Sequence, residues 1–238
     1  MNFQELVDEV IAQTTRPDMG LISNGGDGRI PRAILAATYK LHCLDYFFKD
    51  IQPARIVFDA AGYVQTLDTS VLPRYRSMAY IRKYDPSIDN SQLDPNILPP
   101  LYNNVGAVNP TQSMAFLDPI TPAEVLDSYG SERLDVYYQA GDTVFIKTSS
   151  SITQALFGWY RFPNIDSSNN YANYDSFIAR EFPYAITFSA VAAIYSAIGK
   201  QDQARKLESP YNPKTGEAGE VWMHVMALKR SNILVQGS

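Results

Sequence analysis

The sequence predicts an α+β fold in which N- and C-terminal helices form a helical bundle and a β-rich, antiparallel region is inserted between them. Apolar residues recur at helical spacing near both ends of the chain, whereas strand-like alternation fills the middle. The 238 residues are 45% hydrophobic and 19% charged, an ordinary globular balance that allows a sizeable core. We therefore expect a helical domain from residues 1–53 and 172–238 and an inserted β-rich region from residues 54–171.

Two helices are predicted near the start of the chain. Asn2 can cap a first helix over residues 3–13, and Glu5 is the acid expected near a helix start. A long helix over residues 31–50 follows, because Pro31 suits a first helical position and one apolar stripe runs down the segment. The stripe consists of Ile34, Ala37, Leu41, Leu44 and Phe48.

The middle of the chain predicts strands joined by turns. The expected segments are a hairpin of residues 55–58 and 63–67 around Ala60–Gly62, a strand over 77–84, a hairpin of 135–139 and 143–147, and a strand over 152–162 with Gly158 as a bulge. Thr121 is expected to cap a short helix that ends near Gly130. Residues 85–119 are rich in Pro and Asn but hold apolar side chains, so we expect this long excursion to contact a partner or a neighbouring subunit.

The last part of the chain returns to helical patterns. Residues 184–198 are apolar nearly all round, which predicts a helix buried on several sides, with Gly199 as its C-terminal cap. A short helical turn over residues 202–207 and a final helix over residues 217–232 should follow.

Composition excludes several classes of function. A formal net charge of −5 disfavours a nucleic-acid binder, although it does not exclude a protein that surrounds DNA without binding it tightly. The single Cys43 rules out an intrachain disulfide and suits a reducing compartment, and its place in the long helix predicts a buried thiol. We expect no membrane contact and no signal peptide, because no apolar run approaches the ~20 residues of a membrane span.

The two histidines, His42 and His224, lie in predicted helices without a useful neighbour. His42 and Cys43 are adjacent and point to different sides of a helix, so they cannot hold one metal ion together. No second Cys or paired His offers zinc-ligand spacing. We therefore predict structural roles for both histidines and no metal-binding residues.

Two loop sequences resemble binding motifs only superficially. Residues 25–28, Gly-Gly-Asp-Gly, precede a helix but lack the Gly-Lys-Ser/Thr of a phosphate loop, which favours a hinge or turn. Residues 85–89 have the ligand spacing of the first positions of a calcium loop. However, Asn90 stands where an EF-hand needs Gly, and Asn96 stands where it needs Glu.

No catalytic set is recognisable in the sequence. Ser149–Ser151 and Ser167–Ser168 lack the G-x-S-x-G context of a nucleophile and are interpreted as loops. A carboxylate pair such as Glu181 with Asp175 carries little weight alone. We therefore expect no catalytic residue, no cofactor and no enzymatic activity.

Basic residues gather at Arg74, Arg76, Arg82 and Lys83, with tyrosines between them. A strip of this kind can bind single-stranded nucleic acid. Strand alternation would divide these side chains between two faces, so a solvated face or a protein interface is the better interpretation.

Several segments together resemble the head–tail adaptor (connector, head-completion) proteins of short-tailed bacteriophages, in particular the SU10-type adaptors. The order and spacing of these segments carry the resemblance over most of the chain, except residues 85–119. The segments are Phe3-Gln4-Glu5-Leu6-Val7 with Arg16-Pro17-Asp18, the stretch Ala33 to Asp50, Leu72-Pro73-Arg74-Tyr75-Arg76 leading into Tyr80-Ile81-Arg82, Tyr137-Tyr138-Gln139-Ala140-Gly141-Asp142, and Ile178-Ala179-Arg180-Glu181-Phe182-Pro183-Tyr184 entering Ala190 to Gly199.

The resemblance implies a structural virion protein, made in the bacterial host cytoplasm and located at the head–tail interface. It implies a dodecameric ring beneath the portal protein, built by the helical domain, that extends the DNA channel and seats a tail nozzle or tube protein. DNA would pass through without sequence-specific binding. The chain beyond Ile233, residues 234–238, is the expected portal contact, and the β-rich region should face the tail or adjacent subunits.

Three alternatives stay open at this point. The first is another virion ring protein, such as a tail terminator or stopper. The second is a cytoplasmic enzyme of unknown type. The third is a peptide-binding or scaffold module outside phages.

Overall fold

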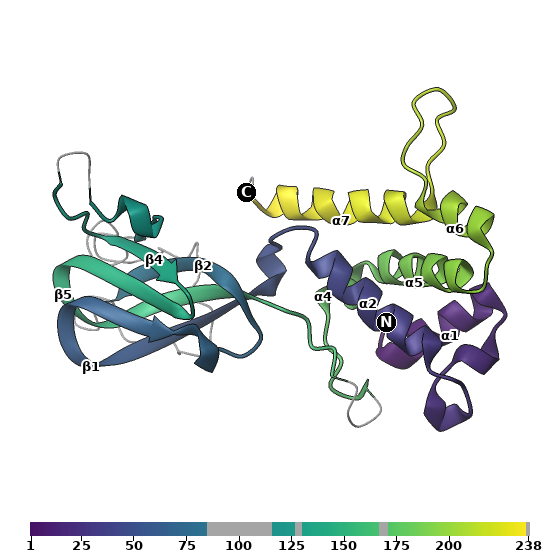
Figure 1. The fold of residues 1–238 in the computed structure, drawn as a ribbon, viewed down its shortest axis with the longest axis horizontal. Helices are drawn as coiled ribbons and strands as arrows, with labels where there is room; N and C mark the ends of the chain where they lie inside the picture. Colours follow the sequence, from purple (N-terminus) through teal and green to yellow (C-terminus); the bar gives the residue numbers. More distant parts are fainter. Residues whose placement is uncertain (85–115, 127–129, 167–170, 237–238) are drawn as a thin grey trace, which may run out of the picture. The chain divides into compact units, whose positions relative to one another are not determined.

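The computed structural model describes residues 1–84, 116–126, 130–166 and 171–236 (Figure 1). The chain divides into two compact units, one of Met1–Asp50 with Phe162–Ser238 and one of Ile51–Arg161. The ranges expected from the sequence, 1–53 with 172–238 and 54–171, place both boundaries further along the chain. Each unit is described separately below.

The fold class predicted from the sequence is wrong. The described residues form six α-helices and a five-stranded mixed sheet, rather than a helical bundle with an inserted antiparallel region. The sheet is mixed because β3 (Asp118–Pro119) pairs in parallel with β4 (Val136–Ala140). It is also a structural centre of its own, since it carries a hydrophobic cluster that runs from Leu67 to Trp159.

The first unit is helical (Figure 1). Its α-helices are α1 (Phe3–Thr14), α2 (Arg29–His42), α4 (Phe177–Glu181), α5 (Pro183–Ala197), α6 (Gln201–Glu208) and α7 (Glu220–Gln236). Short 3-10 turns occupy Pro17–Met19, Ile22–Asn24 and Phe48–Asp50.

The predicted cap of α1 is confirmed. The Asn2 side chain accepts a hydrogen bond from the Glu5 amide at 2.9 Å, and the Glu5 carboxylate accepts one from the Asn2 amide at 2.8 Å. This reciprocal pair satisfies two backbone donors that a helix start otherwise leaves open. Helix α1 therefore begins where the sequence indicates, and it ends at Thr14.

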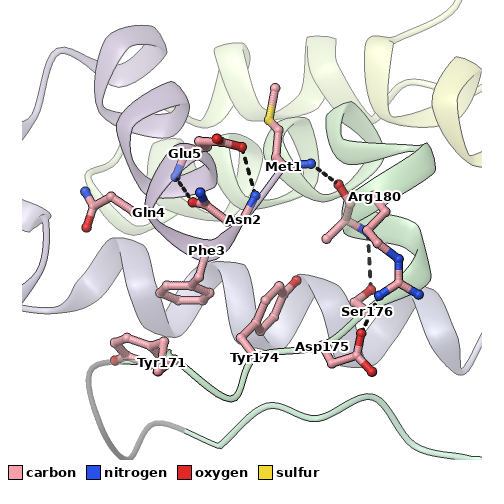
Figure 2. Close-up of a pocket in the computed structure, with 12 residues that line it drawn as sticks. Met1, Asn2, Phe3, Gln4, Glu5, Tyr171, Tyr174, Asp175, Ser176 and Arg180 are labelled. Carbon is pink, nitrogen blue, oxygen red and sulfur yellow. Dashed lines mark hydrogen bonds and ion pairs between the residues drawn. The ribbon is translucent and has the colours of Figure 1, made fainter.

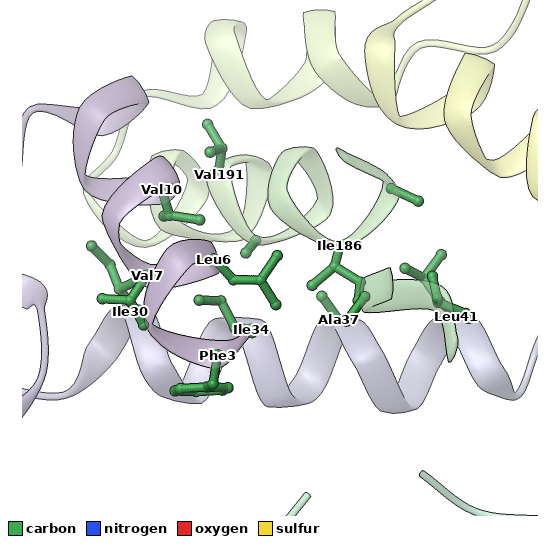
Figure 3. Packing of buried hydrophobic residues seen from close by; sticks show 14 of the residues in the cluster. Phe3, Leu6, Val7, Val10, Ile30, Ile34, Ala37, Leu41, Ile186 and Val191 are labelled. Carbon is green, nitrogen blue, oxygen red and sulfur yellow. The ribbon is translucent and has the colours of Figure 1, made fainter. Parts of the chain in front are cut away.

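Helix α5 lies at the centre of the helical unit, in contact with α1, α2, α4, α6 and α7. The sequence predicts this position, because a helix that is apolar all round must be buried on several sides. Figure 3 shows Ile186 and Val191 of α5 beside side chains of α1 and α2. The residues from α1 and α2 in that view are Phe3, Leu6, Val7, Val10, Ile30, Ile34, Ala37 and Leu41.

The long helix predicted to reach Asp50 is wrong, since α2 ends at His42. Phe47 is buried and packs edge-on against Phe177, whereas the predicted stripe residue Leu44 is exposed. Asn232 of α7 stabilises the non-helical path, because its side chain accepts a hydrogen bond from the Phe48 amide at 3.2 Å. Burial of Phe47 and this bond to a distant helix override the local helical pattern.

The second unit is built on a five-stranded sheet (Figure 1). Its strands are β1 (Ile51–Asp68), β2 (Tyr75–Tyr84), β3, β4 and β5 (Thr143–Arg161), in the order β1-β5-β4-β3 with β2 also paired to β5. Residues 143–147 of β5 lie between β1 and β4, and residues 154–161 lie between β1 and β2. Strand β5 therefore organises the unit.

The predicted hairpin from Val136 to Lys147 is confirmed by the pairing of β4 with β5. The predicted hairpin around Ala60–Gly62 is wrong, because residues 51–68 form one strand that bulges between Val57 and Gly62. The Gln65 side chain holds this bulge by donating to the Ala60 carbonyl at 2.9 Å and to the Ile152 carbonyl at 3.1 Å.

Two further local predictions are corrected. The helix expected after Thr121 is only a 3-10 turn over Pro122–Glu124. Ser149–Ser151, interpreted as a loop, continue strand β5.

Gly158 allows β5 to pass closely between its neighbours. It is buried and lies opposite Pro53 of β1 and Tyr80 of β2. A Cβ atom at this position would lie 2.5 Å from a ring carbon of Tyr80 and 2.9 Å from a methyl of Ile51. Relief of these contacts requires both the buried Tyr80 ring and the Ile51 side chain to shift.

We expect Gly158→Ala to destabilise the sheet unit by about 1–3 kcal/mol, the usual cost of overpacking a core. The chain has two Trp residues, so a Trp222→Phe background leaves Trp159 as the reporter of urea unfolding. Thr153→Ala, at an exposed position of the same strand, should change stability by less than about 0.5 kcal/mol. An unchanged unfolding midpoint for Gly158→Ala would show that the strands can separate at no cost.

Candidate functional site

Three buried polar side chains from distant parts of the helical unit meet at His42. The His42 Nδ1 atom lies 2.7 Å from an Asp50 carboxylate oxygen, and its Nε2 atom lies 2.9 Å from the Ser176 hydroxyl. The three residues are 1%, 4% and 4% exposed. We refer to this set as the His42 network.

Each member of the His42 network stands at the end of a local element. His42 is the last residue of α2, Asp50 ends the 3-10 turn Phe48–Asp50, and Ser176 caps α4 by accepting from the Ala179 amide at 3.3 Å. Because a carboxylate only accepts, we assign the Nδ1 proton to the bond with Asp50. With that assignment His42 accepts the Ser176 proton at Nε2, and both ring nitrogens have a hydrogen-bond partner.

The His42 network has the order of a hydrolase triad, with nucleophile, base and orienting acid. A catalytic serine must also present its hydroxyl to a substrate. Ser176 is nearly fully buried, and its hydroxyl bonds with His42 on one side and the α4 amide on the other. We therefore interpret the His42 network as a clamp that holds the ends of α2 and α4 together.

No pattern in the sequence indicates this network, and the prediction that His42 lacks a useful neighbour is wrong. On a continuous helix, Asp50 would lie about 12 Å along the axis from His42, at ~1.5 Å per residue. The contact exists because α2 ends at His42 and the chain turns back. Ser176 is 134 positions away in the sequence, and no local signal connects it with His42.

A pocket of about 690 Å³ lies beside the network (Figure 2). The start of α1 and residues 171–180 form its walls. Figure 2 shows the rings of Phe3, Tyr171 and Tyr174 close together. The Phe3 ring stacks on Tyr171 at a centroid distance of 4.1 Å and meets Tyr174 edge-on at 4.9 Å. The apolar wall of the pocket is thus aromatic.

Most polar groups of this pocket bind one another, whereas the Ser176 hydroxyl in its lining bonds with His42 and the Gln4 amide donates to Asp8. Arg180 pairs with Asp175 at 2.5 Å, and the Met1 ammonium group donates to the Ala179 carbonyl at 2.7 Å. Asn2 is held by the capping box (Figure 2). These contacts stabilise the wall of the pocket. They do not direct a set of reactive groups towards one point inside it.

Tyr174 connects the pocket with α2. Its hydroxyl lies 2.8 Å from the Thr38 hydroxyl. Burial raises the pKa of Tyr174 to about 12, against the opposing effect of its hydrogen bonds with Thr38 and Ser176. The phenol therefore stays neutral in the folded protein well above its ordinary pKa of 10.0.

The other candidate residues of the helical unit are dispersed. Cys43 is exposed, so the prediction of a buried thiol is wrong: α2 ends one residue earlier and leaves the thiol outside the core. His224 stacks on Phe188 at 5.4 Å, as a structural histidine would. Glu181 pairs with Lys49, and Asp175 pairs with Arg180, so the two carboxylates each have a cationic partner.

The Gly-Gly-Asp-Gly segment forms an ordered turn. The Asp27 amide donates to the Asp18 backbone carbonyl at 2.8 Å, and the Gly28 amide donates to the Gly20 carbonyl at 2.9 Å. Gly25 and Gly28 have φ values of 84° and 77°, which favour glycine. The turn interpretation is therefore confirmed.

The cluster of basic residues in the sheet unit does not form one strip. Arg82 is buried with its guanidinium 4.7 Å from the Phe116 ring centroid, and Lys83 forms an ion pair with Asp135. Burial alone would raise the pKa of Asp135, but hydrogen bonds from Lys83 and Ser149 hold that pKa below its usual value. Arg82 and Lys83 therefore make their contacts with other residues of the sheet unit.

Several sequence features lie outside the described residues. They include the calcium-like residues 85–96, Ser167–Ser168 and most of the excursion 85–119. Helix α7 extends to Gln236, so residues 234–236 belong to a helix rather than to an extended tail.

Within the described ranges, no group of three or more His, Cys, Asp or Glu side chains is placed to hold a metal ion. No helix in that part of the chain is long and apolar enough to cross a membrane. No protein-family model matches the chain, and no curated protein has significant sequence similarity to it.

Removal of Asp50 tests the structural role of the His42 network. We expect Asp50→Ala to lower the free energy of unfolding of the helical unit by about 2–4 kcal/mol, because it leaves buried His42 without its acceptor. Urea unfolding followed by helical circular dichroism measures this. Asp202→Ala, at an exposed position of α6, is the control, and a loss equal to that control would contradict the clamp.

Tyr174 makes stability depend on alkaline pH. Its contribution is complete below pH 10 and is lost between pH 10 and 12, because only the unfolded chain ionises there. Tyr174→Phe should cost about 0.5–1.5 kcal/mol at neutral pH, and its unfolding free energy should fall less steeply than the wild type above pH 10. Exposed Tyr184→Phe should follow the wild-type slope; equal slopes for all three proteins would refute the burial argument.

Proposed function

We propose that this protein is a structural virion component, a head-to-tail adaptor. Copies of the chain would form a dodecameric ring beneath the portal protein, extend the DNA channel and seat a tail nozzle or tube protein. The protein would be made in the bacterial host cytoplasm and retained in the virion. The resemblance in the order and spacing of short segments suggested this function.

The observation that carries the proposal is the apolar exposure of β1. Val57, Tyr63 and Val64 on this strand are 61%, 61% and 56% exposed. Strand β1 pairs with β5 along one edge, and among the described residues no strand pairs with its other edge. Proteins that work alone usually protect a long edge of this kind, so it favours a chain whose surface is completed by assembly.

Charge and chemistry agree with a passive channel component. The formal net charge of −5 suits a wall along which DNA slides, since an excess of acidic side chains weakens attraction to phosphates. In the described part of the chain, the basic residues Arg82 and Lys83 make contacts within the protein.

Electron microscopy of the purified protein mixed with the cognate portal tests the proposal. We expect a collar added to one end of the portal, with portals alone as the reference. Val57→Glu combined with Tyr63→Glu should reduce the fraction of portals with a collar, whereas Val71→Ser, at an exposed apolar position outside β1, should not. Bare portals in the presence of excess folded wild-type protein would refute the assignment.

Two alternative functions have separate signatures. A tail terminator or stopper would bind an isolated tail tube and leave the portal bare. A hydrolase would use the His42 network, which among the described residues is the arrangement that favours an enzyme. Covalent labelling of Ser176 by a fluorophosphonate in the folded protein, lost in His42→Ala, would support that function over the adaptor.

A further inference from the structure

Helices α1 and α2 expose faces of opposite charge. The sequence of α1 contains Glu5, Asp8 and Glu9 and no Lys or Arg. The sequence of α2 contains Arg29, Arg32 and Lys40 and no Asp or Glu. All six side chains are exposed or half-buried. We call these the acidic α1 face and the basic α2 face.

Arg29 pairs with Asp27, and the Arg32 guanidinium donates to the Gly28 and Asp27 carbonyls at 3.1 and 3.0 Å, but the other charges have no ion-pair partner among the described residues. Asp8 accepts from neutral Gln4 at 2.7 Å, and Glu9 accepts from neutral Gln13 at 2.8 Å. No ion pair of the described residues includes Asp8, Glu9, Arg32 or Lys40. Each face therefore keeps charge that an external partner can use.

The packing of the unit directs the two faces outwards. The buried residues of α1 and α2 belong to one hydrophobic cluster, and Figure 3 shows Leu6 and Val10 of α1 above Ile34 and Ala37 of α2. Since both helices turn their apolar stripes towards this shared core, their charged faces point away from it. One molecule can thus present the two faces to two different neighbours.

The shape of the faces permits close helix packing. Ala36 is exposed between Arg32 and Lys40 at i, i+4 spacing, and Ala12 is exposed one turn beyond Asp8. Small residues at the centre of a contact let two helices approach to about 8–10 Å. Arg32 and Lys40 can then flank the approaching helix and meet its carboxylates.

We propose that the acidic α1 face of one copy binds the basic α2 face of the next copy. This inference rests on the proposed adaptor ring and specifies its subunit contact. The pattern fits a head-to-tail arrangement, in which each copy turns its acidic α1 face to one neighbour and its basic α2 face to the other. A repeated head-to-tail contact is the kind that closes into a ring.

Charge reversal tests this contact in the portal mixture described above. One variant, Asp8→Lys with Glu9→Lys, makes both faces basic; the other, Arg32→Glu with Lys40→Glu, makes both faces acidic. Each alone should lower the fraction of portals with complete collars at least about tenfold, because every subunit contact then joins like charges. Glu5 is left unchanged so that the α1 capping box remains.

Two restorations separate a contact from a folding defect. An equimolar mixture of the two variants can alternate around a ring with opposite charges at every contact, so collars should return to within about twofold of the wild-type level. The quadruple variant carries all four substitutions, so that the α1 face is basic and the α2 face is acidic. It should restore collars without a second variant. Failure of both restorations, with helical circular dichroism unchanged, would overturn the proposed contact.

Matched controls place equal charge changes on α6. Asp202→Lys with Glu208→Lys and Arg205→Glu with Lys206→Glu alter exposed residues outside both faces, and both should form collars as the wild type does. If the α1 and α2 variants also form normal collars, the contact is wrong and the adaptor function stands. If the wild type forms no collar, the adaptor function itself fails.

Discussion

The buried hydrogen bonds of His42 determine how the helical unit is built. Asp50 can reach the imidazole only because α2 stops at His42, and Ser176 can reach it only because α4 begins beside that stop. An unsatisfied polar group at this depth would be costly, so the three side chains must be placed together or not at all. The end of α2, the 3-10 turn that carries Asp50 and the start of α4 therefore depend on one another.

Features that depend on neighbours in sequence were predictable. The Asn2 cap, the burial of α5 on several sides and the β4–β5 hairpin each follow from a local pattern, and each is present. Their physical causes act within one turn of helix or across one hairpin. Local sequence patterns are therefore sufficient to predict these features.

Features that depend on distant residues were not predictable. The stop of α2 depends on Phe177, Asn232 and Ser176, and the bulge of β1 depends on Gln65 and the Ile152 carbonyl. The parallel pairing of β3 with β4 likewise joins residues without a sequence signal. The His42 network could not be predicted for the same reason, because its residues lie far apart in the sequence. Tertiary contacts decided these points against local preference.

The bulge of β1 has a consequence for the behaviour of the protein at high concentration. An intact edge of 18 residues would be a template on which any other strand could add, and added strands could propagate into fibres. The bulge between Val57 and Gly62 breaks the spacing of backbone donors and acceptors midway. Only a surface shaped to that irregular outline can bind along the full strand, so indiscriminate polymerisation is suppressed while shape-specific recognition is retained.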